Sequence, residues 1–223
     1  MHADNLILSS VPLENTPHLW EKNDILIFLI DLDNYDVLST KNLNNAEKEY
    51  LEKLQTLYFK KRFIVSRTVL KHILCNLLKM ESILNISTYK DRYGEVHILD
   101  HEDLHICISY SENIIALAIS KIKIGVDIEI KRPLKLKNTL KYLHKTPLYT
   151  GNSITDSGVL NIWTLKEAYC KFSNQSMLSF LNKEPDFNNA LYFSFVLDDK
   201  YIFSIVTESC RHTISINHLE KFI

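Results

Sequence analysis

Apolar positions along the first half of the chain follow patterns that predict both strands and helices. Residues 24–31 form a short apolar run rich in isoleucine, which predicts a buried strand, although its periodicity alone does not exclude a helix. Between residues 44 and 80, apolar positions recur at helical spacing in two stripes. One helix of that length is unusual in a compact domain, so we predict two helices that meet near Phe59.

Two further patterns predict turns. Tyr93 and Gly94 mark the first turn. Residues 104–109 alternate between apolar and polar positions, and a second apolar run covers residues 114–119, with the polar residues 111–113 between them. This second arrangement predicts a β-hairpin.

Residues 124–130 (IGVDIEI) alternate without interruption. Isoleucine or valine fills each even-numbered position, and the odd-numbered positions hold Gly125, Asp127 and Glu129. This period of two predicts a strand with one buried face. Pro133 ends the strand, and the polar residues that follow, as far as Asn161, predict a partly helical excursion or lid.

The last third of the chain predicts one helix and three strands. Residues 164–167 have the Thr-x-x-Glu form of a capping box, which predicts a short helix from Thr164 through Phe172. β-rich runs at residues 191–197, 200–207 and 212–216 predict an antiparallel meander. Because strands and helices do not alternate regularly along the chain, the patterns favour the α+β class.

Composition and charge narrow the class of protein. The 223 residues suffice for one large domain or two small ones. The 26 basic and 27 acidic residues nearly balance, whereas a duplex-binding domain usually carries a basic excess, so nucleic acid is not an expected partner. No uncharged run reaches the roughly 18 residues of a membrane span, and residues 1–30 lack a secretory signal. Four widely spaced cysteines indicate a reducing compartment, and we expect a cytoplasmic protein.

Asp127 and Glu129 carry the first candidate chemistry. Two positions apart on a strand, their Cα atoms lie about 7 Å apart on the same face. One interpretation is that this face of the strand is simply exposed to solvent, where acidic residues are common. The alternative is a Mg²⁺ site, since Mg²⁺ takes one or two carboxylates and completes its shell with water and phosphate oxygens.

Glu167 and Lys171 are separated by four positions and therefore share a helix face. One interpretation makes Glu167 the acidic member of a capping box and Lys171 its partner in an ordinary ion pair. The functional interpretation makes Glu167 a third metal ligand or a base, and Lys171 a cation placed over a phosphate.

Basic residues and serines give weaker signals. Arg62, Arg67 and Lys71 lie on the second predicted helix and form either a solvated stripe or a phosphate site. Residues 131–145 contain six lysines or arginines and no acidic residue, so they form either a solvated loop or a positive surface that attracts an acidic partner. Residues 109–111 (SYS) lie at a predicted turn, where hydroxyls and backbone N–H groups could meet an anion.

Taken in order, these segments resemble the 4'-phosphopantetheinyl transferase superfamily, specifically the larger monomeric type that acts on carrier proteins of peptide and fatty-acid synthetases. The family's hallmark is a G-x-D-x-E strand followed some tens of residues later by W-[STC]-x-K-E-[AS]-x-x-K. Both motifs are present, and the resemblance runs from about Leu43 to Phe172. The segments that carry it are RFIVSR (62–67), ISYS (108–111), IGVDIEI (124–130) and IWTLKEAYCKF (162–172).

The resemblance implies an enzyme, its cosubstrate and its partner. It implies transfer of phosphopantetheine from coenzyme A to a serine of an apo acyl or peptidyl carrier protein, with Mg²⁺ as cofactor and adenosine 3',5'-bisphosphate as product. It also implies a monomer in which two similar α+β halves, here residues 1–122 and 123–223, are related by a pseudo-twofold axis.

The resemblance also assigns roles by motif position. Glu167 would take the serine proton and Lys171 would hold a phosphate oxygen. The implied metal ligands are Asp127, Glu129 and Glu167, and the implied coenzyme A contacts are Arg62, Arg67, Gly94, Ser109 and Lys171.

Two departures from the family pattern leave an alternative. Tyr110 stands where the family usually has a histidine between two serines, and Glu95 stands within a turn that usually reads G-K-P. The alternative is an inactive family member that binds a carrier protein or a nucleotide as a partner module.

Overall fold

The computed structural model describes residues 5–35, 39–92, 94–132, 156–180 and 183–222. Contacts between residues divide the chain into two compact units, and neither is continuous in sequence. Unit 1 consists of Met1–Leu8, Ser109–Glu112 and Lys123–Arg211, and unit 2 consists of Ser9–Ile108, Asn113–Ile122 and His212–Ile223. One boundary falls after Ile122, while three short segments are grouped with the other half of the chain. The division into domains 1–122 and 123–223 and the pseudo-twofold axis stay predictions.

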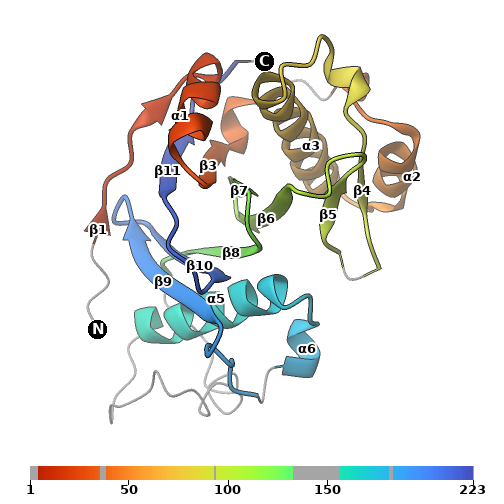
Figure 1. The fold of residues 1–223 in the computed structure, drawn as a ribbon. Coiled ribbons are helices and arrows are strands. Elements are labelled where there is room, and N and C mark those ends of the chain that lie inside the picture. The colour runs from red at the N-terminus through yellow and green to blue at the C-terminus, as the bar shows by residue number, and fades with distance from the viewer. Residues whose placement is uncertain (1–4, 36–38, 93, 133–155, 181–182, 223) are drawn as a thin grey trace. The chain divides into compact units, whose positions relative to one another are not determined.

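Unit 2 is built on a seven-stranded sheet with the order β2-β11-β3-β7-β6-β5-β4. Its interior strand β3 (Ile25–Asp31) pairs antiparallel with β7 (Ile114–Ser120) and parallel with β11 (Ile214–Leu219) (Figure 1). The side chains of residues 25–30 are fully buried, which explains why the strand is apolar without alternation. The expected buried strand at residues 24–31 is confirmed.

Two helices of unit 2 follow the two predicted stripes. Helix α2 (Asn45–Lys53) begins with a capping box between Asn44 and Glu47, and α3 (Leu57–Leu77) begins at the N-cap Thr56. The helices are therefore separated by residues 54–56, slightly before the expected junction at Phe59. Helix α3 is buried on all sides from Phe63 to Lys71, and it contacts β7.

Hairpins of unit 2 form where turns were predicted. Strand β6 (His105–Ser111) neighbours β7, and Glu112 in the intervening turn has a φ of 47°. Strands β4 (Thr88–Lys90) and β5 (Val96–Ile98) pair antiparallel across the turn that contains Gly94. Gly94 has a φ of 94°, a conformation that side chains disfavour. Both predicted turns are thus confirmed within the described residues.

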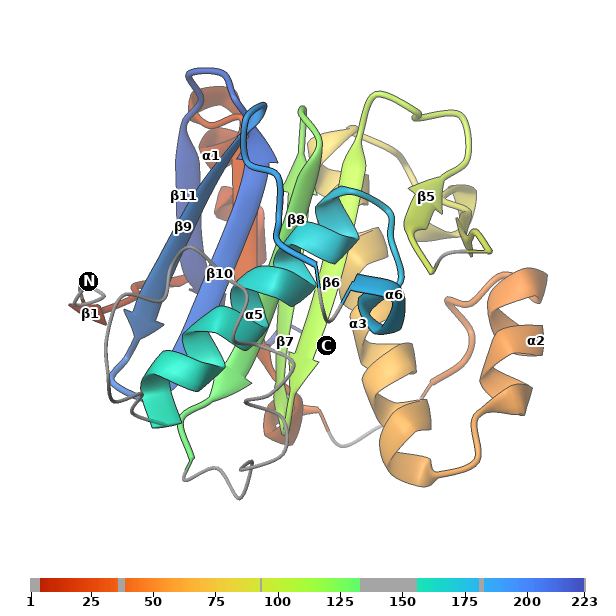
Figure 2. The same ribbon diagram turned by 90° about the horizontal axis from the view of Figure 1, so that it is seen from below.

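Unit 1 contains a four-stranded sheet with the order β1-β9-β10-β8, and helix α5 (Asp156–Phe172) lies across it (Figure 2). Strand β8 (Ile124–Ile130) is the predicted alternating strand, and it pairs antiparallel with β10 (Tyr201–Glu208). The expectation of one buried face is wrong, because Gly125 and Asp127 on the second face are also buried. Helix α5 contacts β8 and β10 closely, which accounts for the second buried face.

Gly125 lets α5 approach the strand. A Cβ atom at this position would lie 2.0 Å from the backbone oxygen of Ala168 and 2.5 Å from the backbone nitrogen of Phe172. No side chain fits at those distances. The glycine of the G-x-D-x-E pattern therefore has a packing role in this chain: it brings the end of α5 onto β8.

The predicted helix start at Thr164 is wrong. Helix α5 begins at Asp156, so Thr164 lies in its interior and is fully buried. Its hydroxyl donates to the Asn161 carbonyl at 3.1 Å and shares a 2.8 Å hydrogen bond with the Ser204 hydroxyl on β10. A capping threonine and a mid-helix threonine that bonds to the preceding turn have the same local sequence, which explains the error.

The predicted meander is half right. Strands β9 (Ala190–Leu197) and β10 form an antiparallel hairpin in unit 1. The third strand, β11, belongs instead to the sheet of unit 2, where it pairs parallel with β3 and with β2 (Ser10–Val11). A local pattern predicts that a segment is a strand but does not identify a partner about two hundred residues away.

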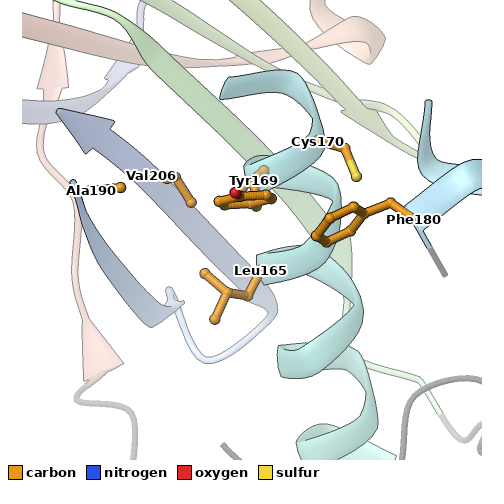
Figure 3. Packing of buried hydrophobic residues seen from close by; sticks show 7 residues of the cluster. Leu165, Tyr169, Cys170, Phe180, Ala190 and Val206 are labelled. Atoms are coloured by element: carbon orange, nitrogen blue, oxygen red, sulfur yellow. The ribbon is translucent and has the colours of Figure 1, made fainter. Parts of the chain in front are cut away.

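The apolar core of unit 1 lies between α5 and the sheet. Tyr169 stacks on Phe180 at 5.1 Å between ring centroids, and Figure 3 shows Val206 on β10 near the same ring. Leu165, Ala168, Cys170 and Ala190 complete the buried cluster. The remaining described elements are β1 (Asn5–Leu6), α1 (Thr16–Lys22), α6 (Met177–Phe180) and the short 3-10 helices Leu13–Asn15, Leu32–Asn34 and Ile83–Asn85.

A membrane span would require a long apolar helix. None of the helices in the described ranges meets that requirement.

Candidate functional site

Asp127 occupies the centre of the candidate site in unit 1. Its side chain lies on β8 beneath α5, and the residue is 2% exposed. Oδ1 accepts hydrogen bonds from the Ser109 hydroxyl at 2.5 Å and from Lys171 Nζ at 2.8 Å. Oδ2 is buried and accepts no hydrogen bond from an N–H or alcohol group in the part of the chain that is described. A buried carboxylate oxygen in this condition calls for a cation or a proton.

Glu129 lies two positions along the same strand and is half-buried. Its Oε2 accepts a 3.2 Å hydrogen bond from the Ser111 hydroxyl and lies 3.6 Å from Nη2 of Arg132. The Ser111 hydroxyl also accepts from the backbone N–H of Ile130 at 2.9 Å, which fixes its orientation. Burial raises the pKa of Glu129, and the charge of Asp127 raises it further.

Glu167 faces Asp127 from α5. Burial raises the pKa of Glu167 to about 8. The charge of Asp127 and a hydrogen bond between the Glu167 and Asp127 side chains act in the same direction, while Lys171 opposes them. Since Asp127 raises the pKa of both glutamates, the three carboxyl groups interact as one cluster. When all three carboxyl groups are ionised, the cluster holds more negative charge than Lys171 and Arg132 compensate, and the raised pKa of Glu167 reflects this excess.

Lys171 sits one helical turn after Glu167. Its ammonium group donates to Oδ1 of Asp127 and, at 3.1 Å, to the carbonyl of Val126. The lysine therefore bridges α5 and β8, which goes beyond the simple ion pair within one helix that the spacing allows. The bond is possible because Gly125 admits the end of α5 to the strand.

The geometry of the three carboxylates bears on the metal. The ligand atoms of Asp127, Glu129 and Glu167 do not all lie within 4.8 Å of one another. Among the described residues, that spacing is found for Asp91, Glu95 and His97. Mg²⁺ usually takes one or two carboxylates directly and keeps several waters, so a third carboxylate can act through water.

Ser109 and Ser111 are positioned differently from the expectation. Both lie within β6 and are buried, so they do not occupy the turn itself. Each serine reaches the acidic residue 18 positions later, Asp127 or Glu129. Ser111 belongs to the SYS segment considered above as an anion site, but it is not among the contacts that the family resemblance implies. A usable signal was present, because S-x-S on one strand matches D-x-E on another, and the shared period of two places both hydroxyls on one face.

The predicted basic residues lie in unit 2, on α3. The guanidinium of Arg62 stands over the ring of Tyr58 at 5.2 Å from its centroid, and Arg67 stands over Phe63 at the same distance. Arg67 and Lys71 are almost fully buried, so the interpretation as a solvated stripe is wrong for them. The proposed phosphate contacts of Arg62 and Arg67 stay predictions.

Lys71 has a structural role in unit 2. Its ammonium group forms a 2.7 Å ion pair with Oε2 of Glu47 and donates at 2.7 Å to the carbonyl of Asn42. Glu47 in turn accepts from the Thr88 hydroxyl at the start of β4 and from the backbone N–H of Asn44. This buried network joins α2, α3 and β4, and it leaves Lys71 bound to protein groups.

Gly94 also belongs to unit 2, where it occupies the β4–β5 turn. Unit 1 thus brings together five of the eight predicted site residues, while Arg62, Arg67 and Gly94 are in unit 2. Of the basic segment 131–145, Lys131 and Arg132 are described, and the rest, like most of the predicted excursion, lies outside the described residues.

Comparison with known proteins connects this geometry to a reaction. No protein-family model matches the chain. Over 97 residues, however, the chain is 29% identical to the 4'-phosphopantetheinyl transferase gsp of Aneurinibacillus migulanus. The match covers 42% of this chain and 40% of that protein. The similarity supports an assignment at the level of the superfamily, and the larger monomeric type belongs to the proposal below.

Proposed function

We propose that this protein transfers 4'-phosphopantetheine from coenzyme A to a serine of an apo acyl or peptidyl carrier protein, with Mg²⁺ as cofactor. Adenosine 3',5'-bisphosphate is the second product. The proposal places the enzyme in the cytoplasm as a monomer of the larger family type. The observation that carries it is the buried Oδ2 of Asp127, which accepts no hydrogen bond from an N–H or alcohol group of the described residues and lies in an acidic cluster with Glu129 and Glu167.

The donor set fits Mg²⁺ by chemistry and charge. Carboxylate oxygens are hard ligands of the kind that Mg²⁺ prefers, and Asp127 supplies a buried one. Asp127 and Glu129 would hold the ion, with Glu167 as a direct or water-mediated ligand. When bound, Mg²⁺ would neutralise charge on the pyrophosphate of coenzyme A and so favour its cleavage.

The chain's own groups would perform the remaining tasks. The carboxylate of Glu167 accepts the hydroxyl proton of the carrier serine, directly or through water. The serine Oγ then forms a bond to the phosphorus on the pantetheine side as the bond from that phosphorus to the leaving adenosine bisphosphate breaks. Lys171, already at the site through Asp127, holds a phosphate oxygen as charge develops on the leaving group.

Other residues would position the cosubstrate. Arg62 and Arg67 bind the 3'-phosphate in this proposal, and Gly94 allows the backbone to approach coenzyme A. Ser109 donates its hydroxyl to Asp127, so it orients the central carboxylate next to the phosphates.

A mass measurement tests the proposed function. The purified protein is incubated with coenzyme A, Mg²⁺ and a panel of apo carrier proteins, and a carrier should gain the mass of one phosphopantetheine group. The gain should disappear when EDTA replaces Mg²⁺. If the protein binds coenzyme A but modifies no carrier of the panel, the inactive binding module becomes the better interpretation.

Two substitutions locate the reaction in the acidic cluster. Asp127→Asn keeps the size of the side chain and should abolish transfer, and Glu167→Gln should lower the rate by about 10²–10⁴, as expected for loss of a base. Asp199→Asn is the matched control, because this exposed aspartate of unit 1 has a φ of 56° that asparagine tolerates. Transfer by Asp127→Asn at the wild-type rate would show that the metal assignment is wrong.

A further inference from the structure

The β4–β5 hairpin of unit 2 presents a second group of metal-ligating side chains. Asp91 follows β4, Glu95 precedes β5, and His97 lies within β5. One ligand atom from each residue lies within 4.8 Å of the other two. None of the three residues belongs to the proposed transferase site, which uses other side chains.

The hairpin itself brings the three groups together. Asp91 N–H donates to the Glu95 carbonyl at 3.0 Å, and Gly94 N–H donates to the Asp91 carbonyl at 3.1 Å. The turn needs the positive φ of Gly94. As a result, residues at positions i, i+4 and i+6 of a short segment meet at one place, supported by backbone hydrogen bonds on both sides of the turn.

Other contacts hold two of the three side chains in place. Oδ1 of Asp91 accepts from the Glu95 N–H at 2.9 Å, whereas Oδ2 lies 3.5 Å from Nε2 of His97. The imidazole ring of His97 stacks on Tyr89 with centroids 5.2 Å apart, which restricts its rotation. A ligating carboxylate held by a second hydrogen bond and a ligating imidazole held in one orientation are typical of metal sites.

The donor types select a class of ion. An imidazole nitrogen with two carboxylate oxygens suits Zn²⁺, Co²⁺, Ni²⁺ or Mn²⁺, whereas Mg²⁺ and Ca²⁺ bind oxygen ligands. Three protein ligands leave at least one coordination position for water or another ligand. Ligand atoms in a tetrahedral or octahedral shell of about 2.0–2.2 Å bonds lie closer together than 4.8 Å, so the partly exposed side chains close slightly around the ion.

We propose that Asp91, Glu95 and His97 form a binding site for a divalent transition-metal ion, of which Zn²⁺ is the best-fitting example. Binding fixes the β4–β5 hairpin by joining the end of β4 to β5 across the turn. The site is separate from the acidic cluster around Asp127 and does not depend on the transferase activity.

Zn²⁺ and Co²⁺ titrations of the full chain test the site. The protein carries no affinity tag and is first freed of metal with a chelator, because its nine histidines can otherwise mask one specific site. Zn²⁺ binding is measured by calorimetry with Mg²⁺ in excess, and Co²⁺ binding by its visible absorption. We expect one equivalent of Zn²⁺ that competes with Co²⁺ at the same site.

Variants assign the binding to the hairpin. His97→Gln and Glu95→Gln should each weaken Zn²⁺ binding by about tenfold or more. His101→Gln is the matched control, since His101 is a histidine of the same unit outside the group, and it should bind as the wild type does. Asp127→Asn should also retain the site, so failure of the transferase proposal leaves this one intact.

Two results would overturn the site. One is unchanged Zn²⁺ affinity in His97→Gln, provided that the metal-free variant unfolds at the wild-type temperature. The other is loss of the bound equivalent in Asp127→Asn, which would place the ion at the acidic cluster instead.

Discussion

At the scale of single residues, the surroundings of Glu167 raise its pKa far above the ordinary value of a glutamate. Its neighbours are carboxylates, and burial removes the water that would otherwise screen them. The pKa of about 8 means that metal-free folded protein keeps a proton on this group at pH values where the unfolded chain has lost it.

This difference predicts a pH dependence of stability. Because the pKa is raised on folding, the folded state binds the extra proton between the ordinary value of 4.5 and about 8. The free energy of unfolding of metal-free protein should therefore fall as the pH rises through that window. Glu167→Gln should remove most of the fall, as measured by urea unfolding in EDTA from pH 5 to 9.

A control separates this effect from general charge repulsion. Glu208 is an exposed glutamate of the same unit, and Glu208→Gln should leave the wild-type pH dependence in place. Identical pH dependence in Glu167→Gln and wild type would mean that Glu167 is ionised in the folded protein.

Gly125 gives a second prediction at this scale. Gly125→Ala forces a methyl group against the backbone of Ala168 and Phe172, so either α5 or β8 must shift. We expect a loss of roughly 1–3 kcal/mol in the free energy of unfolding, as for other overpacked sites. We also expect weaker transfer activity, since the Lys171–Asp127 contact depends on this approach.

Gly94→Ala is the comparison for Gly125→Ala. A Cβ atom at residue 94 would meet nothing within 4 Å, so that substitution reports backbone strain without a clash. Urea unfolding of both variants tests the packing role, and an unchanged unfolding midpoint in Gly125→Ala would contradict it.

At the scale of helices and strands, the elements with a strong local pattern were predictable and their partners were not. Strand β8 was predictable from alternation, and β3 from an unbroken apolar run. The burial of Asp127 was not, because a polar residue on an alternating strand predicts a solvent face unless a helix covers it. The sheet of β11 was missed for the same reason, since it depends on contacts with distant segments.

In the candidate site, too, the residues could be predicted from the sequence but their contacts could not. Asp127, Glu129, Glu167 and Lys171 could be identified from motif spacing. Their hydrogen bonds to Ser109 and Ser111 required the pairing of segments that the sequence leaves open.

The buried ion pair between Glu47 on α2 and Lys71 on α3 gives a prediction about the stability of unit 2. Lys71 and Glu47 are 1% and 3% exposed, so Lys71→Met leaves a buried carboxylate without its cation. We expect a loss of about 3–5 kcal/mol in the free energy of unfolding. The double variant Glu47→Gln/Lys71→Met should lose less than the single variant, because glutamine carries no uncompensated charge. Its amide oxygen can still accept from the Asn44 N–H, and its NH2 group can donate to the Thr88 hydroxyl. Strictly additive losses would contradict a coupled pair.

At the scale of the whole molecule, charge is nearly balanced overall but uneven along the chain. Residues 131–145 carry six basic and no acidic residues directly after the strand of the acidic cluster. Their role as a surface for an acidic carrier protein stays a prediction, since most of the segment lies outside the described residues.

Charge reversal tests that role. Replacing Lys135, Lys137 and Lys141 with glutamate should weaken use of the carrier protein and flatten its dependence on salt, because charges at an interface chiefly set the association rate. Coenzyme A binding should stay unchanged. The measurement is the transfer rate against carrier concentration at several ionic strengths. An equal loss of coenzyme A affinity would place these lysines at the cosubstrate.

The position of β11 has a consequence for how the chain acquires its fold during synthesis. Strand β3 is complete once residue 31 has been made, yet its parallel neighbour is residues 214–219. The ribosome must therefore synthesise nearly two hundred further residues, including Ser109–Glu112 and Lys123–Arg211 of unit 1, before that side of β3 is covered. Until then the nascent protein exposes an apolar strand edge, which is the kind of surface that chaperones bind and that leads to aggregation.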